Sequence, residues 1–231
     1  TNIRQLERVR QNFVANVSHE LKTPITLIKG FLDTLLNGAA NNSDERDEFL
    51  RIIQNHAYRL EAIIEDLLSL SRIEQDNYLT SIDMNSESFN DIIEKAILAC
   101  HDKAKKKGVS VIFDSSKTVI GKMNVSLMEQ AVINLIDNAI KYSLPNDDVS
   151  ILLNESSSDI TITVSDNGCG ISNEHIPHLF ERFYRVDVAR SRDLGGTGLG
   201  LSIVKHIAQA HSGEVSVKSM VGKGSSFSIH I

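Results

Sequence analysis

His19 has the neighbours of a residue that could accept a phosphoryl group. It belongs to the segment Phe13–Pro24, and at 100° per residue it lies about 160° from the centre of an apolar helical stripe. It should therefore face water, where an imidazole is largely unprotonated at neutral pH and can attack phosphorus. Glu20 could accept or orient a proton during that attack, and Pro24 should bend the helix because its ring crowds the preceding turn. The alternative is a solvated surface histidine beside a chance proline.

A second group of polar side chains shares one face of a helix predicted at about 124–142. Asn134, Asn138 and Lys141 fall within about 60° of one another on the helical wheel, opposite Val132 and Ile136. Amide oxygens can bind Mg²⁺, and a lysine can neutralise phosphate. This face therefore suits a metal–phosphate ligand, although a solvated helix face is the commoner meaning of a polar stripe.

Two glycine-rich segments follow. The first, Asp166-Asn167-Gly168-Cys169-Gly170, comes after a predicted strand, and an aspartate held between flexible residues could accept a hydrogen bond from an adenine amino group. A hairpin turn is the ordinary alternative, but residues 171–183 do not alternate as a returning strand would. The second, 195–200, leads into a helix predicted at 199–211, whose N-terminal N–H groups favour phosphate. It is neither a P-loop nor a dinucleotide fingerprint.

Between the glycine segments lies Phe180-Glu181-Arg182-Phe183-Tyr184-Arg185. Arg185 or Arg182 could reach a γ-phosphate. We expect Phe180 and Phe183 mostly to pack in the core.

His19 itself lies on the first of two long amphipathic helices. The first is predicted at 3–36 and ends in the polar run Asn37–Ser43, where Asn42 and Ser43 are candidate caps for the second. Both carry apolar residues at steps of three or four, namely Leu6, Val9, Phe13, Val17, Leu21, Ile25, Ile28, Leu32 and Leu35, then Phe49, Ile52, Ile53, His56, Leu60, Ile63, Ile64, Leu67 and Leu68. Such a hairpin leaves its stripe half covered, so two copies should pair into a four-helix bundle. The sequence therefore predicts a homodimer.

The rest of the chain mixes helices and strands. Helices are predicted at 90–107, 124–142 and 199–211, and strands at 109–113, 149–153, 160–164, 214–218 and 225–231. This pattern predicts an α/β sandwich. The expected organisation is a dimerisation and histidine phosphotransfer domain at 1–75, a linker at 76–88 and a catalytic ATP-binding domain at 89–231.

Composition excludes several other classes. The net charge of −6 argues against nucleic acid as a ligand, and two cysteines cannot make a disulfide framework. No apolar run approaches the roughly 20 residues of a membrane-spanning helix. Because Thr1 stands where an initiator methionine is expected, we expect a cytoplasmic piece of a longer, membrane-anchored protein.

Taken together, these motifs resemble the sensor histidine kinases of two-component signalling, in the phosphate-sensor-like class. Their order is that of the family: an H box at 13–24, an N box at 134–142, a first G box at 166–170, an F box at 180–185 and a second G box at 195–201. The resemblance covers nearly the whole chain. It implies a helical hairpin, forming a dimeric four-helix bundle, followed by an α/β sandwich that binds ATP and Mg²⁺.

The same resemblance implies roles for single residues. His19 would accept the phosphoryl group with help from Glu20, and pass it to an aspartate of a response regulator. Asn138 and Asn134 would hold Mg²⁺, and Asp166 would recognise adenine. Arg185 would act in catalysis. The remaining nucleotide contacts would come from Lys141, Tyr142, Gly168, Gly170, Ile171, Arg182, Gly196, Thr197, Gly198, Leu199 and Gly200, with 186–199 as a lid.

Thr23 matches the position from which the family orients water to dephosphorylate its partner, so the resemblance implies phosphatase activity as well. The chain departs from the family pattern at Gly121-Lys122, where an aspartate usually follows the glycine; we expect a local effect.

Two other functions compete with this interpretation. An ATPase of the gyrase and chaperone type would place a glutamate at Asn134 to activate water, and an amide cannot be that base. A non-catalytic dimerisation module would not need the set His19, Asn138, Asp166 and Gly198.

Overall fold

The computed structural model describes residues 2–38, 42–74, 83–115, 117–156, 159–187 and 196–231, with side chains from residue 13 onward. It divides into two compact units, Thr1–Leu68 with Val188–Leu199, and Ser69–Asp187 with Gly200–Ile231. Several predicted features lie outside the described residues: the side chains of Leu6 and Val9, residues 76–82 of the linker, and 188–195 of the lid with Gly195.

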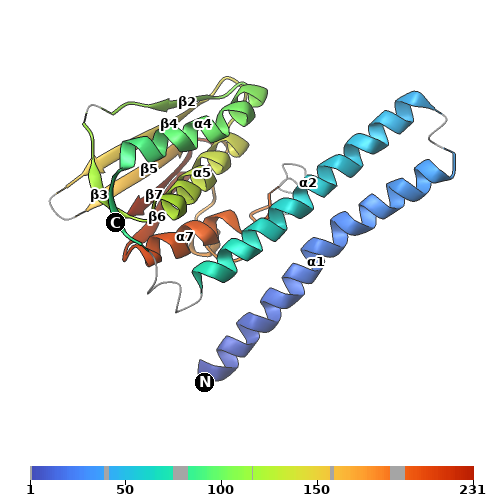
Figure 1. The fold of residues 1–231 in the computed structure, drawn as a ribbon, viewed down its shortest axis with the longest axis horizontal. Helices are drawn as coiled ribbons and strands as arrows, with labels where there is room; N and C mark the ends of the chain where they lie inside the picture. Colours follow the sequence, from blue (N-terminus) through green and yellow to red (C-terminus); the bar gives the residue numbers. More distant parts are fainter. Residues whose placement is uncertain (1, 39–41, 75–82, 116, 157–158, 188–195) are drawn as a thin grey trace. The chain divides into compact units, whose positions relative to one another are not determined.

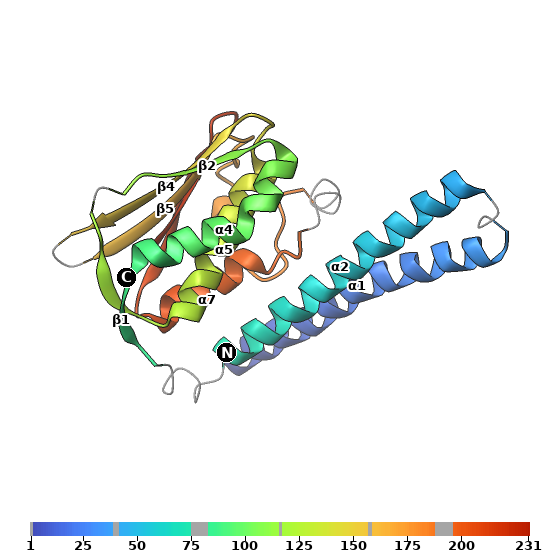
Figure 2. The same cartoon turned by 45° about the horizontal axis from the view of Figure 1, so that its top comes forward.

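The first unit contains the predicted hairpin. Helices α1 (Asn2–Leu36) and α2 (Ser43–Ile73) run side by side (Figure 2), and α1 continues through Pro24. Asn42 caps α2, since its side-chain oxygen accepts a hydrogen bond from the Asp44 N–H at 3.1 Å. The rings of Phe31 and Phe49 meet between the helices with centroids 5.3 Å apart. The predicted two-helix hairpin is confirmed.

Many apolar side chains of this hairpin remain exposed. The exposed set on the two helices comprises Val14, Ile25, Leu27, Leu32, Leu36, Leu50, Tyr58, Ile64 and Leu68. A hairpin buries only one side of each amphipathic helix, so apolar residues are left exposed on both helices and are available for a further helix partner.

The second unit is built on a five-stranded sheet with the strand order β2-β4-β5-β7-β6. The bounds are β2 Ser110–Phe113, β4 Asp148–Glu155, β5 Ile160–Asp166, β7 Gly224–His230 and β6 Glu214–Met220. β2 pairs in parallel with β4, and the other pairs are antiparallel. The predicted strands are therefore present, including the C-terminal hairpin.

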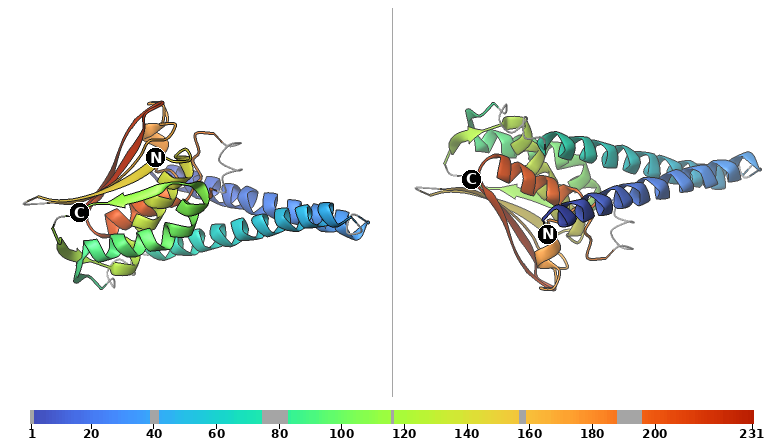
Figure 3. Two further views of the ribbon diagram at one scale, coloured as in Figure 1. Left: turned by 90° about the horizontal axis from the view of Figure 1, so that it is seen from above. Right: turned by 90° about the horizontal axis from the view of Figure 1, so that it is seen from below.

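Three helices cover one face of this sheet: α4 (Phe89–Lys107), α5 (Val125–Tyr142) and α7 (Gly200–Ala210). Figures 1 and 3 show them on the same side of the strands. Alternate strand residues such as Ile162, Val164 and Ile229 are buried beneath them. Gly108 ends α4 in the left-handed conformation, with φ 69°. This is the predicted α/β sandwich.

Two strands were not predicted. β1 (Asn85–Ser88) pairs antiparallel with β3 (Ile120–Met123) in a separate two-stranded sheet. β1 is polar and mostly exposed, so it shows no apolar alternation. β3 packs against a residue distant in sequence. Its Gly121 lies so close to the Phe89 ring that an added Cβ would be 2.8 Å from it. Lys122, where the family usually has aspartate, is exposed on β3.

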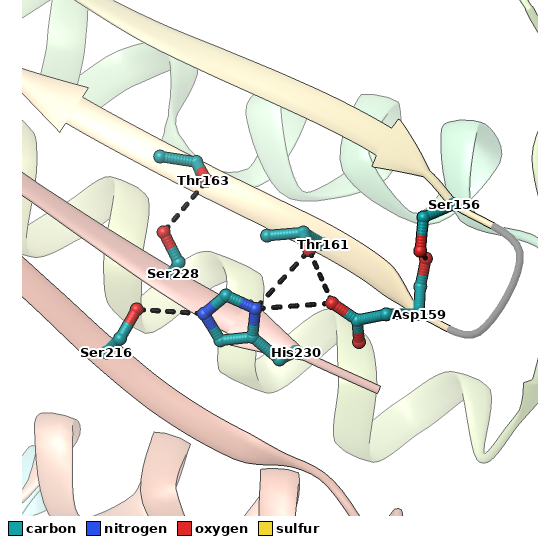
Figure 4. Close-up of polar contacts among 7 residues, drawn as sticks. All are labelled: Ser156, Asp159, Thr161, Thr163, Ser216, Ser228 and His230. Atoms are coloured by element: carbon teal, nitrogen blue, oxygen red, sulfur yellow. Dashed lines mark hydrogen bonds and ion pairs between the residues drawn. The ribbon is translucent and has the colours of Figure 1, made fainter.

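The sheet face that points away from the helices carries hydroxyl groups and one imidazole (Figure 4). Ser216 Oγ lies 2.8 Å from Nε2 of His230, while Nδ1 of that ring lies 3.4 Å from Asp159 Oδ2 and 3.3 Å from Thr161 Oγ1. Thr163 and Ser228 pair across the strands at 2.8 Å. These cross-strand pairs satisfy the polar groups of neighbouring strands and stabilise their register.

His211 connects the end of α7 to the start of α5. Its Nδ1–H donates to the Ile207 carbonyl at 2.7 Å, and its Nε2 accepts from the Asn124 N–H at 3.0 Å. The bond from Asn124 requires the neutral ring, because a protonated Nε2 has no lone pair with which to accept it. Burial lowers the pKa of His211 by more than the hydrogen bond to Ile207 raises it.

Because the unfolded chain takes up this proton more readily, His211 stabilises the fold fully above pH ~6.5 and progressively less as the pH falls toward the lowered pKa. We expect wild-type protein to lose more stability between pH 7.5 and 5.5 than the His211→Gln variant. Thermal unfolding of both variants at each pH measures this. His101→Gln, at an exposed position, should keep the wild-type pH dependence. Equal pH dependence in wild type and His211→Gln would contradict the assignment.

Candidate functional site

The candidate phosphoacceptor His19 is exposed on α1, as predicted. Its neighbour Glu20 is partly buried and faces α2. Thr23 Oγ1 donates to the His19 carbonyl at 3.1 Å, one turn back along the helix. The structure therefore brings His19, Glu20 and Thr23 together on two adjoining turns of α1.

Glu20 has a partner that the sequence analysis missed. Arg59 Nη2 on α2 donates to Glu20 Oε2 at 2.9 Å, and only 8% of the arginine side chain and 16% of the glutamate side chain are exposed. A signal was present, because Arg59 lies three residues after His56 and four before the buried Ile63, on the predicted inward face of the helix. A charged residue at an inward position implies an ionic partner across the interface.

The predicted amide face lies on α5. Asn124 caps the helix, its side-chain oxygen accepting from the Leu127 N–H at 3.0 Å. Asn134 and Asn138 are half-buried, and Lys141 Nζ lies 5.5 Å from the centroid of the Tyr142 ring. α5 therefore presents the four predicted residues, Asn134, Asn138, Lys141 and Tyr142, along its less buried side.

One side-chain donor on this helix has no hydrogen-bond partner among the residues that the structure describes. The Asn134 side-chain Nδ2 is buried, yet it makes no hydrogen bond to any group in the described part of the chain. A buried unpaired amide N–H is costly, about 1–3 kcal/mol. Its neighbour is Gly200, the first residue of α7, where an added Cβ would lie 3.7 Å from the Asn134 amide. A bound anion would satisfy this donor.

Asp166 ends β5 and is only 6% exposed. Its Oδ1 accepts from the Gly168 N–H at 2.9 Å. Burial raises the pKa of this carboxyl, against the opposing effect of backbone hydrogen bonds from Gly168 and Ser225. A buried carboxylate at a loop can recognise an amino group by accepting its hydrogen bond.

The loop after Asp166 depends on close backbone approaches. A Cβ at Gly168 would lie 2.2 Å from the Tyr142 carbonyl oxygen, and one at Gly170, where φ is 66°, would lie 2.0 Å from the Met220 carbonyl oxygen. Ile171 N–H donates to Ser219 Oγ at 2.8 Å. The loop is thus fastened to the end of α5 and to the β6–β7 turn, so the predicted Asp166, Gly168, Gly170 and Ile171 share one region with α5.

The arginines between the glycine segments have different surroundings. Arg182 forms an ion pair with Glu74, which also lies 3.2 Å from His206 Nε2. Burial raises the pKa of Glu74, although Arg182 acts in the opposite direction. Arg185 is half-buried. Arg182 is therefore engaged by a protein carboxylate here, and its predicted contact with phosphate stays a prediction.

The second glycine segment divides between the two units. Gly200 opens α7 beside Asn134, whereas Gly196–Leu199 group with the hairpin. Gly198 has φ 77°, a value that favours glycine. Thr197 Oγ1 donates to Asp66 at 2.6 Å and accepts from the Leu199 N–H at 3.1 Å. The predicted contact of these four residues with the nucleotide therefore stays a prediction.

The two units thus carry a water-facing histidine on a helical hairpin and, on an α/β sandwich, a buried aspartate loop beside a helix with polar side chains. Comparison with known proteins agrees. Residues 9–76 match the His Kinase A (phospho-acceptor) domain, and residues 123–231 match the histidine kinase-, DNA gyrase B- and HSP90-like ATPase family.

The sensor protein SrrB of Staphylococcus aureus is 35% identical over 231 residues, which are 100% of this chain and 39% of SrrB. The chain thus spans about two fifths of that relative. The Acinetobacter baumannii histidine kinase AdeS is 28% identical with a TM-score of 0.73, over 92% of this chain and 96% of that one. Histidine kinase ThkA, solved in complex with response regulator protein TrrA, shares the fold with a TM-score of 0.78 at 22% identity, over 99% of this chain and 63% of that one.

The chain belongs to the histidine kinase family and carries its phospho-acceptor domain followed by its ATP-binding domain. The first of these domains separates it from the gyrase and HSP90 ATPases that share the second. In the part of the chain that the structure covers, no helix combines the length and apolar character needed to cross a bilayer.

Gly168→Ala should weaken ATP binding by more than about tenfold, roughly 1.4 kcal/mol. The added Cβ meets backbone of α5, so the loop carrying Asp166 must move. Titration of a fluorescent ATP analogue into purified protein measures the effect. Gly30→Ala, where nothing lies within 4 Å of the added Cβ, is the matched control and should bind like wild type. Unchanged affinity in Gly168→Ala would show that the loop is not part of the nucleotide site.

Proposed function

We propose that this chain is the catalytic core of a sensor histidine kinase, which transfers the γ-phosphoryl group of ATP to His19 and then to an aspartate of a response regulator. The observation that carries the proposal is an exposed histidine, with a carboxylate held beside it, in a phospho-acceptor domain joined to an ATP-binding domain. The chain covers only part of its relative SrrB, so the activity of the whole protein belongs to the proposal.

Three features support a nucleotide at the α/β unit. The buried Asp166 carboxylate would accept a hydrogen bond from the adenine amino group. The unpaired Asn134 Nδ2 fits a phosphate oxygen or a water of a metal shell. Gly200 is the first residue of α7 and lies beside Asn134, and the backbone N–H groups of a helix N-terminus favour an anion.

Asn138 and Asn134 would hold Mg²⁺ through their amide oxygens. Neutral oxygen ligands and retained waters suit this ion, which would neutralise charge on the phosphates. Lys141 and Tyr142 would contact phosphate and nucleotide, and Arg185 would stabilise charge on the transferred group. Gly196, Thr197, Gly198 and Leu199 would complete the pocket as part of the proposed lid.

At the hairpin, a ring nitrogen of His19 attacks the γ-phosphorus as the bond to the ADP oxygen breaks. The new N–P bond leaves a proton on the other ring nitrogen, and Glu20 takes up that proton. The exposure of His19 supports this role, because the attacking imidazole has to meet a nucleotide held by another domain.

The partners proposed are a second copy of the chain and a response regulator. Homodimerisation into a four-helix bundle would cover the exposed apolar residues of α1 and α2. ThkA is described in complex with a response regulator, and the same kind of partner is proposed here. We also propose that the chain is the cytoplasmic part of a longer, membrane-anchored sensor, in the phosphate-sensor-like class that its motifs resemble, with domain boundaries at 1–75, 76–88 and 89–231.

His19→Gln should abolish protein labelling by γ-labelled ATP with Mg²⁺ while leaving ATP affinity unchanged, since His19 is not part of the proposed nucleotide pocket. Wild-type label should be acid-labile and alkali-stable, as expected of phosphohistidine. His101→Gln, an exposed histidine on α4, should label like wild type. Label retained in His19→Gln would reveal another acceptor, and release of free phosphate alone would indicate an ATPase.

We also propose that the chain dephosphorylates its response regulator, with Thr23 orienting the attacking water. Thr23→Ala should leave autophosphorylation intact but slow dephosphorylation of a response regulator by about tenfold, or 1.4 kcal/mol, because a water-orienting hydroxyl is lost. The substrate is a regulator first labelled by the wild-type chain. Thr34→Ala removes a hydroxyl with a similar bond, 2.9 Å to the Gly30 carbonyl, and should have no effect. An equal fall in both activities would refute the role of Thr23.

A further inference from the structure

Arg59 is a charged residue in an apolar position. It lies on α2 with 9% of its surface exposed, near the buried Ile63 of the same helix. Arginine is seldom buried to this extent unless it is paired. A guanidinium carries a permanent positive charge, so its presence in the hairpin needs an explanation beyond packing.

The partner of Arg59 is the residue next to the phosphoacceptor. Nη2 of Arg59 donates to Oε2 of Glu20 at 2.9 Å, across 39 residues of sequence and from one helix to the other. A charge-assisted bond of this length fixes the orientation of the carboxylate. Since Glu20 follows His19 directly, a contact made on α2 determines where the candidate proton acceptor of α1 points.

A second observation shows that the guanidinium is not satisfied by structural contacts alone. The buried Nε of Arg59 makes no hydrogen bond within the described residues. His56, one turn earlier on α2, is not a counter-charge for Arg59, because an imidazole is either neutral or cationic. Burial and, to a lesser extent, the charge of Arg59 lower the pKa of His56 and so favour its neutral form. A purely structural arginine would be expected to use all its buried donors.

We propose that Arg59 is a positioning residue for phosphoryl transfer, holding Glu20 in the orientation in which it takes the proton that His19 loses. This rests on the proposed kinase function. In that step a lone pair of one imidazole nitrogen forms the N–P bond, the P–O bond to ADP breaks with its electron pair leaving on ADP, and the proton of the other imidazole nitrogen passes to Glu20. Arg59 touches neither the phosphorus nor the imidazole in this step; it acts through the carboxylate.

The test is a double-mutant cycle on the rate constant of autophosphorylation at saturating ATP. Arg59→Gln should lower this rate constant by about tenfold or more, but by no more than the roughly 10²–10⁴-fold that a positioned proton acceptor contributes as a whole. The KM for ATP should stay unchanged. In a Glu20→Gln background the same substitution should change the rate by less than about twofold, because its target is already absent.

Two further variants separate positioning from folding. Arg59→Lys keeps the charge and one donor and should restore part of the rate, whereas Arg51→Gln removes an exposed arginine from the same helix and should have no effect. Labelling by phosphoramidate, a small phosphoryl donor that needs no ATP-binding domain, reports whether His19 is still presented on a folded hairpin. If Arg59→Gln does not fold, the comparison of Arg59→Lys in the two Glu20 backgrounds decides the question.

Equal losses in both Glu20 backgrounds would overturn the inference, since Arg59 would then act independently of Glu20. A faster rate in Arg59→Gln would overturn it as well, because the arginine would be withholding the carboxylate. Wild-type protein that takes no label from ATP would defeat the proposed function together with this inference. Wild-type labelling matched in rate by Arg59→Gln would defeat the inference alone.

Discussion

The proposed nucleotide site of the α/β unit depends on the division of α5 into a buried apolar face and a polar face. Its buried residues are Leu127, Met128, Ala131, Val132, Leu135, Ile136, Ala139 and Ile140. A period of 3.6 residues per turn places Asn134, Asn138 and Lys141 away from them. The apolar packing that anchors the helix therefore also directs the three polar side chains, and a rotation of α5 would bury them.

The Asp166 loop is positioned by backbone contacts and not by side chains. Gly168 lies against the last residue of α5, and Gly224 lies so close to the Asp166 carbonyl that a Cβ would approach it to 1.9 Å. Because these approaches exclude every larger residue, the end of β5, the end of α5 and the start of β7 are held together. Burial disfavours the charged form of Asp166. The close backbone contacts nevertheless hold this residue in its buried position at the start of the loop.

In the hairpin, His19 faces water and so cannot be positioned by burial. His19 takes its direction from the helix, and its neighbour Glu20 takes its direction from the pair with Arg59. Removing the charges of Glu20 and Arg59 from water costs free energy. Such a cost is more readily explained at a functional site, where the orientation of the carboxylate matters, than in a core that only has to pack. The exposed apolar residues of both helices are available to pack against the proposed second copy of the chain.

The sequence by itself determined the helices, most strands and the identity of the candidate site residues. Periodicity, caps and glycines act over a few residues, so α4 (Phe89–Lys107) and α5 (Val125–Tyr142) lie within one residue of their predicted bounds, 90–107 and about 124–142. Tertiary structure decided β1 and β3, the Arg59–Glu20 pair, the Arg182–Glu74 pair and the unpaired donor of Asn134. Each of these is a relation between groups far apart in the chain, and a polar residue carries no local mark of the partner it will meet. Only the folded chain brings such groups within the 3–4 Å over which hydrogen bonds and ion pairs act.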